Sequence, residues 1–162
     1  MRTVIGKFAN GSRLQNLLLS LGLLLGLACG LRGDAQAQVS TMNVLKRTAA
    51  AVALEEQRDE QVLFIQVDHV SRNNQRKQTY PLDGNARYRI YAIGDDDRIT
   101  DIDLSVLNDR NLLVKRDNDA ENIAIVDFAV QQAGNYTFQV NPYRMRSGAR
   151  DGFFSLILVR LE

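Results

Sequence analysis

The sequence predicts an all-β, mainly antiparallel sandwich of about eight strands, preceded by one N-terminal α-helix. Three observations support this fold class. Apolar residues recur with a period of two from about residue 61 onward, turn-forming residues follow at short intervals, and no stretch between the expected strands is long enough for a crossover helix. Parallel α/β folds need such helices, so the pattern favours an antiparallel sandwich or barrel over them. A chain of 162 residues fits a single domain with its own core.

The first 37 residues are expected to form a secretory signal peptide. Residues 1–16 are basic and lack acidic residues, residues 17–31 form a short Leu-rich apolar run, and residues 35–38 read Ala-Gln-Ala-Gln. Cleavage after Ala37 would make the chain an exported protein of the periplasm or the exterior. A lipoprotein cut before Cys29 and an uncleaved anchor are the alternatives, but the apolar run is shorter than the about 20 residues that a membrane span needs.

Removal of residues 1–37 also limits the chemistry of the remaining chain. It removes the only cysteine and shifts the formal net charge from +1 to slightly negative. Disulfides, thiolate metal sites and a cysteine nucleophile are therefore excluded. With a net charge so close to zero, we expect no binding to nucleic acid and, after signal removal, no insertion into a membrane. A single histidine, His69, excludes His-rich metal sites and gives no support for a Ser-His-Asp site.

Residues 38–60 are expected to hold a flexible leader, 38–42, and a helix, 43–60. Asn43 can cap this helix, and its Ala-rich centre has high helix propensity. The charged end, residues 55–60, is expected to be solvated. A single weakly apolar helix is not stable alone, so it must pack on the rest of the domain or on a partner. The residues at helical spacing that are expected to face inward are Val44, Leu45, Ala49, Val52 and Ala53.

The β-sandwich domain is expected over residues 61–162. Its segments are rich in β-branched and aromatic residues or alternate apolar and polar ones, and the turns between them carry Asn, Asp and Gly. The last strand is apolar on both faces, which predicts a central strand or one covered on both sides. The expected strands are 62–70, 76–82, 86–93, 101–107, 112–116, 123–130, 135–141 and 153–161. The expected core residues are Tyr88, Ile90, Leu104, Val106, Phe128, Tyr136, Phe138, Val140, Leu156 and Leu158.

Residues 80–160 contain an ordered series of short motifs. The series consists of a Leu-x-Gly turn at 82–84 before the strand with Tyr88, a Gly-Asp strand end at 94–95, Asp-x-Asp-Leu at 101–104, a Val strand ending in Asp at 114–117, and Gly-x-Tyr at 134–136. It resembles the bacterial pre-peptidase C-terminal domain. The resemblance implies a jelly-roll-like β-sandwich on an exported protein. Such modules serve as accessory, targeting or substrate-binding parts, and some of them bind calcium.

Five carboxylates form the most chemically distinctive cluster: Asp95, Asp96, Asp97, Asp101 and Asp103. Carboxylates at this density repel one another unless they are solvated or bound to a cation, and Ca²⁺ takes six to eight oxygen ligands. A solvated loop whose charge is partly offset by Arg98 is the simpler interpretation. A Ca²⁺ site at these five residues is the alternative, and Ca²⁺ is the one candidate cofactor.

A second cluster contains Tyr143, Arg144, Arg146 and Arg150 on an expected hairpin loop. It could bind an acidic partner or a polyanion, and a solubilising loop is the alternative. No residue pair marks a catalytic site, and Trp, which often stacks on sugars, is absent. The expected function is therefore an exported, non-enzymatic accessory or binding module for a protein or polysaccharide, in the cell envelope or outside the cell. A structural or assembly subunit that docks through helix 43–60 is the alternative, and a small secreted hydrolase is a weaker one.

Overall fold

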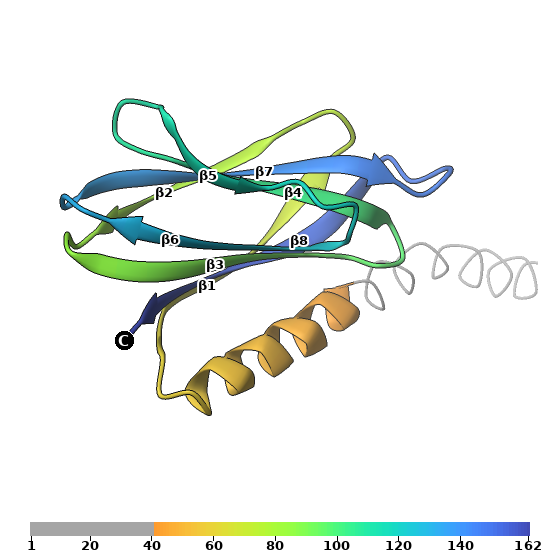
Figure 1. The fold of residues 1–162 in the computed structure, drawn as a ribbon. Coiled ribbons are helices and arrows are strands. Elements are labelled where there is room, and N and C mark those ends of the chain that lie inside the picture. Colours follow the sequence, from red (N-terminus) through yellow and green to blue (C-terminus); the bar gives the residue numbers. More distant parts are fainter. Residues whose placement is uncertain (1–40) are drawn as a thin grey trace, which may run out of the picture. The chain divides into compact units, whose positions relative to one another are not determined.

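A computed structural model of the chain describes residues 41–162. The predicted signal peptide, residues 1–37, lies outside the described residues. Eight antiparallel strands form two packed four-stranded sheets, and one helix covers the outer face of one sheet (Figure 1). The all-β sandwich with one N-terminal helix is thereby confirmed. Between residues 41 and 162, no helix is both long and apolar enough to cross a membrane.

The strand order is that of a jelly roll. Sheet A has the order β1-β8-β3-β6, sheet B has the order β2-β7-β4-β5, and every pairing is antiparallel. In this double-sheet arrangement every connection between consecutive strands except β4–β5 crosses from one sheet to the other, and the two inner faces meet in one core. The strands are β1 (Gln61–Ser71), β2 (Arg76–Leu82), β3 (Ala86–Gly94), β4 (Ile99–Leu107), β5 (Leu113–Asp117), β6 (Ile123–Val130), β7 (Gly134–Met145) and β8 (Asp151–Leu161).

The strand bounds agree with the expected ones to within two residues except at the end of β7. The sequence predicted an end at residue 141, whereas β7 continues to Met145. Pro142 lies inside this strand, where it cannot donate a ladder hydrogen bond. The pairing of β4 with β7 accordingly shifts register twice between Ile99 and Asp103. A β-bulge lets a strand remain paired after an irregular residue. Beyond the irregularity, Arg144 still pairs with Asp101 and Met145 with Ile99.

The core between the sheets consists of the alternating inner faces of both. All of the expected core residues lie there, with Tyr136 partly buried at its border and the others buried. Phe128 is central to the aromatic packing, because its ring lies 5.8 Å from that of Tyr88, 6.1 Å from that of Tyr136 and 6.2 Å from that of Phe138. The period-two pattern therefore predicted the core correctly.

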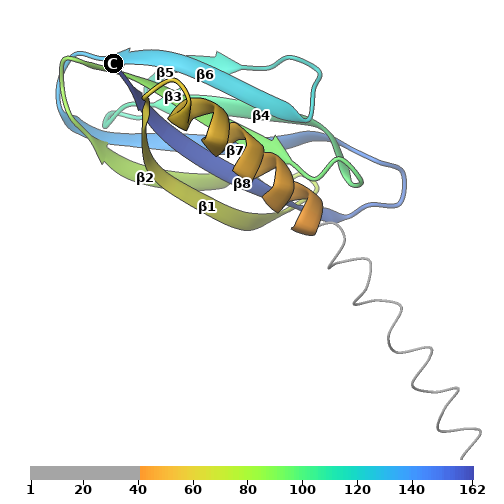
Figure 2. The same ribbon diagram turned by 90° about the horizontal axis from the view of Figure 1, so that it is seen from below.

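Helix 41–56 packs on the outer face of sheet A, over β8 and β3 (Figure 2). The described residues begin at 41, and the helix ends at 56 rather than at 60. Its contact forms a second apolar cluster, in which Ala51 and Val52 of the helix pack against the sheet residues Tyr91, Ile157 and Val159. The last strand, β8, is therefore central and covered on both sides, as predicted. The helix uses its buried face within its own domain, which leaves that face unavailable for docking on a partner.

The predicted inward face of the helix is partly wrong. Val44 is buried, but Leu45, Ala49 and Ala53 are exposed. The buried stripe instead includes the polar residue Thr48, whose hydroxyl lies 2.6 Å from that of Ser155 on β8 and bonds to the Val44 carbonyl at 2.7 Å. The prediction counted only apolar residues, so it missed polar residues that have partners on the sheet.

Glu55 is the largest departure from the sequence-based expectation. Residues 55–60 were expected to be solvated, yet Glu55 has 0% of its surface exposed. Its Oε1 accepts hydrogen bonds from the Tyr91 hydroxyl and from the Nη1 atoms of Arg58 and Arg89, the last two at 3.2 Å. Arg89 also donates to both carboxylate oxygens of Asp127, at 2.6 and 2.7 Å. Glu55 is thus the helix end of a charged network that crosses β3 and reaches β6.

The network changes the proton affinities of its members. Burial, followed by the bond to Glu55, raises the pKa of Tyr91 to about 12. The hydrogen bonds from Arg89 lower the pKa of Asp127, and those to Asp127 raise the pKa of Arg89. The phenol therefore remains a donor, and the ion pair remains charged, over the whole range near neutral pH.

The raised pKa of Tyr91 predicts a specific loss of stability in alkali. Because its folded-state pKa is about 12 against an ordinary value of 10.0, its contribution is complete below pH 10 and is lost as the pH rises toward 12. Urea midpoints of the wild-type protein should therefore fall more steeply between pH 10 and 12 than those of Tyr91→Phe. Tyr143→Phe, at an exposed site, should match the wild type. Equal slopes for Tyr91→Phe and the wild type would contradict the assignment.

Candidate functional site

Two loops that the sequence singled out lie side by side at one end of the sandwich. We define the acidic loop as residues 95–97, after β3, and the arginine loop as residues 143–150, from the end of β7 to β8. The backbone N–H of Arg146 donates to the Arg98 carbonyl at 2.9 Å, and its Nε donates to the Asp96 carbonyl at 3.0 Å. Arg72 Nη2, from the β1–β2 turn, donates to the carbonyls of Arg146 and Ala149. These bonds hold the two loops in one fixed surface.

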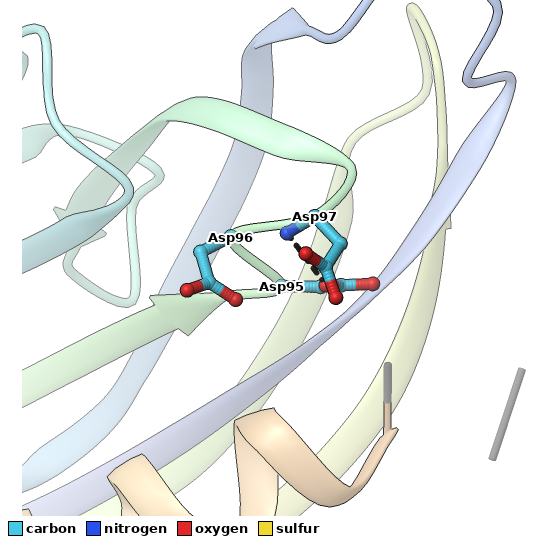
Figure 3. A group of neighbouring side chains, drawn as sticks. All are labelled: Asp95, Asp96 and Asp97. Carbon is cyan, nitrogen blue, oxygen red and sulfur yellow. Dashed lines mark hydrogen bonds between the residues drawn. The ribbon is translucent and has the colours of Figure 1, made fainter. Parts of the chain in front are cut away.

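The acidic loop brings together the carboxylates of Asp95, Asp96 and Asp97 within 4.8 Å of one another (Figure 3). Asp95 is fully buried, and its Oδ1 accepts a hydrogen bond from the backbone N–H of Asp97 at 3.0 Å. Its Oδ2 and the Oδ1 of Asp96 are buried and have no hydrogen-bond partner among residues 41–162. Burial raises the pKa of Asp95, and the neighbouring carboxylates raise it further.

The donor set of the acidic loop fits a hard cation. Carboxylate oxygens are the ligands that Ca²⁺ prefers, and buried oxygens without a partner are costly unless something satisfies them. The loop is also held rigidly, because the Asp95 carbonyl accepts from the N–H groups of Arg98 and Ile99. Three carboxylates supply fewer than the six to eight ligands of Ca²⁺, so water would complete the coordination.

The other two carboxylates of the predicted calcium site lie elsewhere. Asp101 and Asp103 are on β4 and are not part of the group formed by the acidic loop. Asp103 accepts a hydrogen bond from Asn141 Nδ2 at 3.3 Å, and Asp101 Oδ2 lies 4.0 Å from Arg144 Nη2. The five carboxylates therefore do not form one group in the described part of the chain. Asp101 and Asp103 lie within the paired part of β4, opposite Arg144 and Asn141 of β7, whereas the acidic loop precedes this strand.

Asp101 is itself unusual, because it is almost fully buried and its Oδ1 has no hydrogen-bond partner within residues 41–162. Burial raises the pKa of Asp101, the charge of Asp103 raises it further, and Arg144 opposes the change. The charged form of a buried carboxylic acid is less stable than the charged form of the same acid in water, unless a close cation compensates for the burial. Asp101 is paired on the sheet with Arg144, near the start of the arginine loop.

The members of the arginine loop have different roles. Arg146 is fixed by its bonds to the acidic loop, and the carbonyl of Arg150 accepts from the Arg72 N–H at 2.8 Å. Tyr143 is 67% exposed, and the Arg144 side chain is 63% exposed. The loop therefore presents an aromatic ring and a guanidinium to solvent on a backbone that is held in place.

Sequence reasoning missed Asp151 at the start of β8. Its Oδ1 accepts from Arg98 Nη1 at 2.8 Å, and its Oδ2 lies 3.7 Å from His69 Nε2. Arg98 was expected to offset part of the charge of the acidic loop; its charge does lower the pKa of Asp95, while its guanidinium pairs with Asp151. Nothing in the neighbouring sequence indicated this contact, because Asp151 lies beside the end of β1 only as a result of the β1–β8 pairing.

The comparisons with known proteins concern the fold. No family model matches the sequence, and no curated protein matches it. Among solved structures, the Aeromonas hydrophila protein PliG, a periplasmic inhibitor of g-type lysozyme, is similar over 60% of this chain and 85% of its own, with 11% identity and a TM-score of 0.46. The pre-peptidase C-terminal domain of a Bacillus anthracis collagenase is similar over 59% of this chain and 87% of its own, with 11% identity and a TM-score of 0.45.

The second of these structures belongs to the family that the sequence resembles. A pre-peptidase C-terminal domain is thus among the solved structures similar to this chain, in agreement with a fold of that kind. The TM-scores are below 0.5, so no residue of either protein is transferred to this chain. The arguments about the site rest on its own contacts.

The burial of Asp101 predicts that a neutral side chain stabilises the fold. Because the folded-state pKa of Asp101 is raised, its protonated form is favoured in the folded state, and that contribution is lost as the pH rises through this pKa. Asp101→Asn should therefore increase the urea midpoint at pH 7, and the difference from the wild type should shrink as the pH is lowered. Asp119→Asn, at an exposed site, should change little at either pH. A lower midpoint for Asp101→Asn at pH 7 would show that the charge is stabilised in the fold.

Proposed function

We propose that this chain is an exported, non-enzymatic binding module that contacts an acidic surface of a protein partner through Tyr143 and Arg144. The observation that carries the proposal is the exposure of Tyr143. At 67%, it is the most exposed of the large hydrophobic residues among those described. Tyrosine and arginine are enriched at the centres of protein interfaces, because each combines a large contact area with a polar group.

The way in which the loop is held supports binding at this position. Bonds from Arg146 to the acidic loop, and from Arg72 to the carbonyls of Arg146 and Ala149, fix the backbone of the arginine loop. A contact surface that is ordered before binding loses less conformational entropy when the partner arrives. Arg144 gains little from Asp101, since their closest atoms are 4.0 Å apart, so its charge stays available to a partner.

The chemistry of the described residues also favours binding over catalysis. His69 lies 3.7 Å from Asp151, and its ring packs against the edge of Phe153. In the described part of the chain, the contacts of this histidine are with Asp151, Asp68, Arg76 and Phe153, which gives no support for a role as the base of a nucleophile. The buried acids Asp95 and Asp101 belong to different groups, which gives no acid–base pair across a cleft.

Quantitative capture tests the proposed contact. The exported chain would be immobilised and exposed to an envelope extract, and bound proteins would be quantified by mass spectrometry. We expect the variant with Tyr143→Ser and Arg144→Ser to lose a specific subset of proteins by about tenfold or more, since hot-spot residues carry most of the binding energy. The matched control, Val114→Ser with Lys115→Ser on the exposed strand β5, should retain that subset. Capture of the same proteins at the same yield by the wild type, the Tyr143/Arg144 variant and the control would refute the proposal.

We propose in addition that the acidic loop binds Ca²⁺ through Asp95, Asp96 and Asp97. The burial of Asp95 and its unpartnered Oδ2 support this, because a cation would satisfy that oxygen. The ion would neutralise a loop to which Arg146 is attached, so it would stabilise the end of the sandwich that carries Tyr143.

Thermal melts with and without calcium test this site. Wild-type protein in excess Ca²⁺ should melt about 3 °C or more above the value in chelator, because a ligand that binds only the folded state stabilises it. Asp95→Asn should lose this gain. It should not melt below the wild type in chelator, since burial disfavours the charged form of Asp95. Asp109→Asn, on the exposed turn after β4, should keep the full gain. A melting temperature of the wild type that does not respond to Ca²⁺ would refute the site.

A further inference from the structure

We infer that a second copy of this chain pairs antiparallel with the free edge of β1, so that sheet A continues across a two-fold axis. The inference is independent of the arginine loop and of calcium. It begins from the four edge strands of the sandwich, which are β1 and β6 in sheet A and β2 and β5 in sheet B. An open edge offers unpaired N–H and C=O groups to another strand, and soluble proteins usually block such edges.

Three of the four edges are blocked. β2 (RKQTYPL) carries Arg76, Lys77 and Pro81, and β5 (LVKRD) is short and carries Lys115 with Arg116. On β6, the carboxylate of Asp117 accepts the edge N–H of Ile125 at 2.7 Å. β1 differs, because residues 62–67 (VLFIQV) contain neither a charge nor a proline. It is also one of the longest strands, with 11 residues.

The backbone of β1 shows which groups are open. The N–H of His69 donates to its neighbour Asp68 at 2.7 Å, and its carbonyl accepts from Arg76 Nε at 2.7 Å. Both groups of His69 therefore point away from β8, and side chains occupy them. Because backbone direction alternates along a strand, the same groups of Val67 and Ile65 point the same way. Within residues 41–162, β1 pairs only with β8, so these groups face the free edge.

An apolar strip accompanies this edge on the outer face of sheet A. Ile65 and Val67 stand opposite Ile157 and Ser155 of β8, which lie under the helix. Ile65 is 50% exposed and Val67 is 38% exposed. The helix covers β8 and β3 and leaves most of β1 uncovered (Figure 2).

The helix borders this apolar strip on the side away from the free edge. Arg47 donates to the Gly94 carbonyl at 2.9 Å and to Asn122 Oδ1 at 3.0 Å, which turns its side of the helix toward β3 and β6. Helical spacing then places Leu45 and Val52 on the other side, toward β1. Leu45 is 43% exposed, so an apolar side chain of the helix also remains uncovered on the side that faces β1.

A second copy fits this edge because β1 is complementary to itself. An antiparallel pairing centred on Gln66 sets Ile65 opposite Val67 of the other copy, and Val67 opposite Ile65. Both residues have edge-facing backbone groups, so each pairing exchanges two hydrogen bonds. Both also lie on the outer face, where they would form one apolar cluster between the two helices. Glu60 precedes β1 and Arg72 follows it, so the symmetry brings opposite charges to each end of the paired segment.

The first test is the association state of the exported chain across a concentration series, measured by sedimentation equilibrium. We expect a wild-type dimer and, for Val67→Lys, a dissociation constant at least about tenfold higher, because a lysine on an edge strand opposes pairing. Ile125→Lys is the matched control, since Ile125 is 46% exposed on the outer face of β6, the opposite edge of the same sheet. It should leave the dimer unchanged. A monomeric wild type, including one that binds only another protein's extended segment, would overturn the inference.

The second test fixes the register. In the inferred pairing, the two Gln66 residues form a non-hydrogen-bonded pair with Cα atoms about 4.5 Å apart, a separation that a disulfide can span. In the full chain with Cys29→Ser, Gln66→Cys should give a covalent dimer on mild oxidation, whereas Gln78→Cys on the blocked edge of β2 should stay monomeric. Equal cross-linking of the two variants, or a dimer that survives Val67→Lys, would overturn the inference.

Discussion

The arrangement of this molecule depends on the buried carboxylate of Glu55. A single helix of this composition has little stability by itself, so its position must come from contacts with the sandwich. Glu55 supplies a directional contact, because one of its oxygens accepts bonds from Tyr91, Arg58 and Arg89. Breaking a buried charged pair is costly, since it leaves the partner charge without compensation. The helix is therefore fixed in both position and rotation.

That constraint determines which surfaces of sheet A remain open. With Glu55 over β3 and Arg47 bound at Gly94 and Asn122, the helix covers β8 and β3. The apolar residues there, such as Ile157 and Val159, need this cover. β1 lies outside it and keeps Ile65 exposed beside an open backbone edge. At the other end of the helix, Asn43 donates to Asp97 Oδ2 at 3.3 Å, so the same element also contacts the acidic loop.

The sequence was informative where structure follows from local pattern. Alternation along each segment predicted the strands and placed Phe138 and Leu158 in the core, because a strand sends successive side chains to opposite faces. Asp95, Asp96 and Asp97 could be grouped because they are neighbours in the chain. Local pattern could not predict the burial of Glu55, whose partners Arg89 and Tyr91 lie 34 and 36 residues away. The same limit applied to the separation of Asp101 from the acidic loop, because Asp101 pairs with Arg144 of β7, which lies 43 residues away in the chain.

Hydrogen–deuterium exchange of the helix amides tests most directly whether Glu55 anchors the helix. An undocked helix of this length would exchange rapidly, so protection of residues 45–56 reports its packing on sheet A. In wild-type protein these amides should exchange about as slowly as those of β8. In Glu55→Gln they should exchange at least about tenfold faster, while the amides of β4 in sheet B stay unchanged. Rapid exchange of residues 45–56 in the wild type, or no acceleration in Glu55→Gln, would contradict the account.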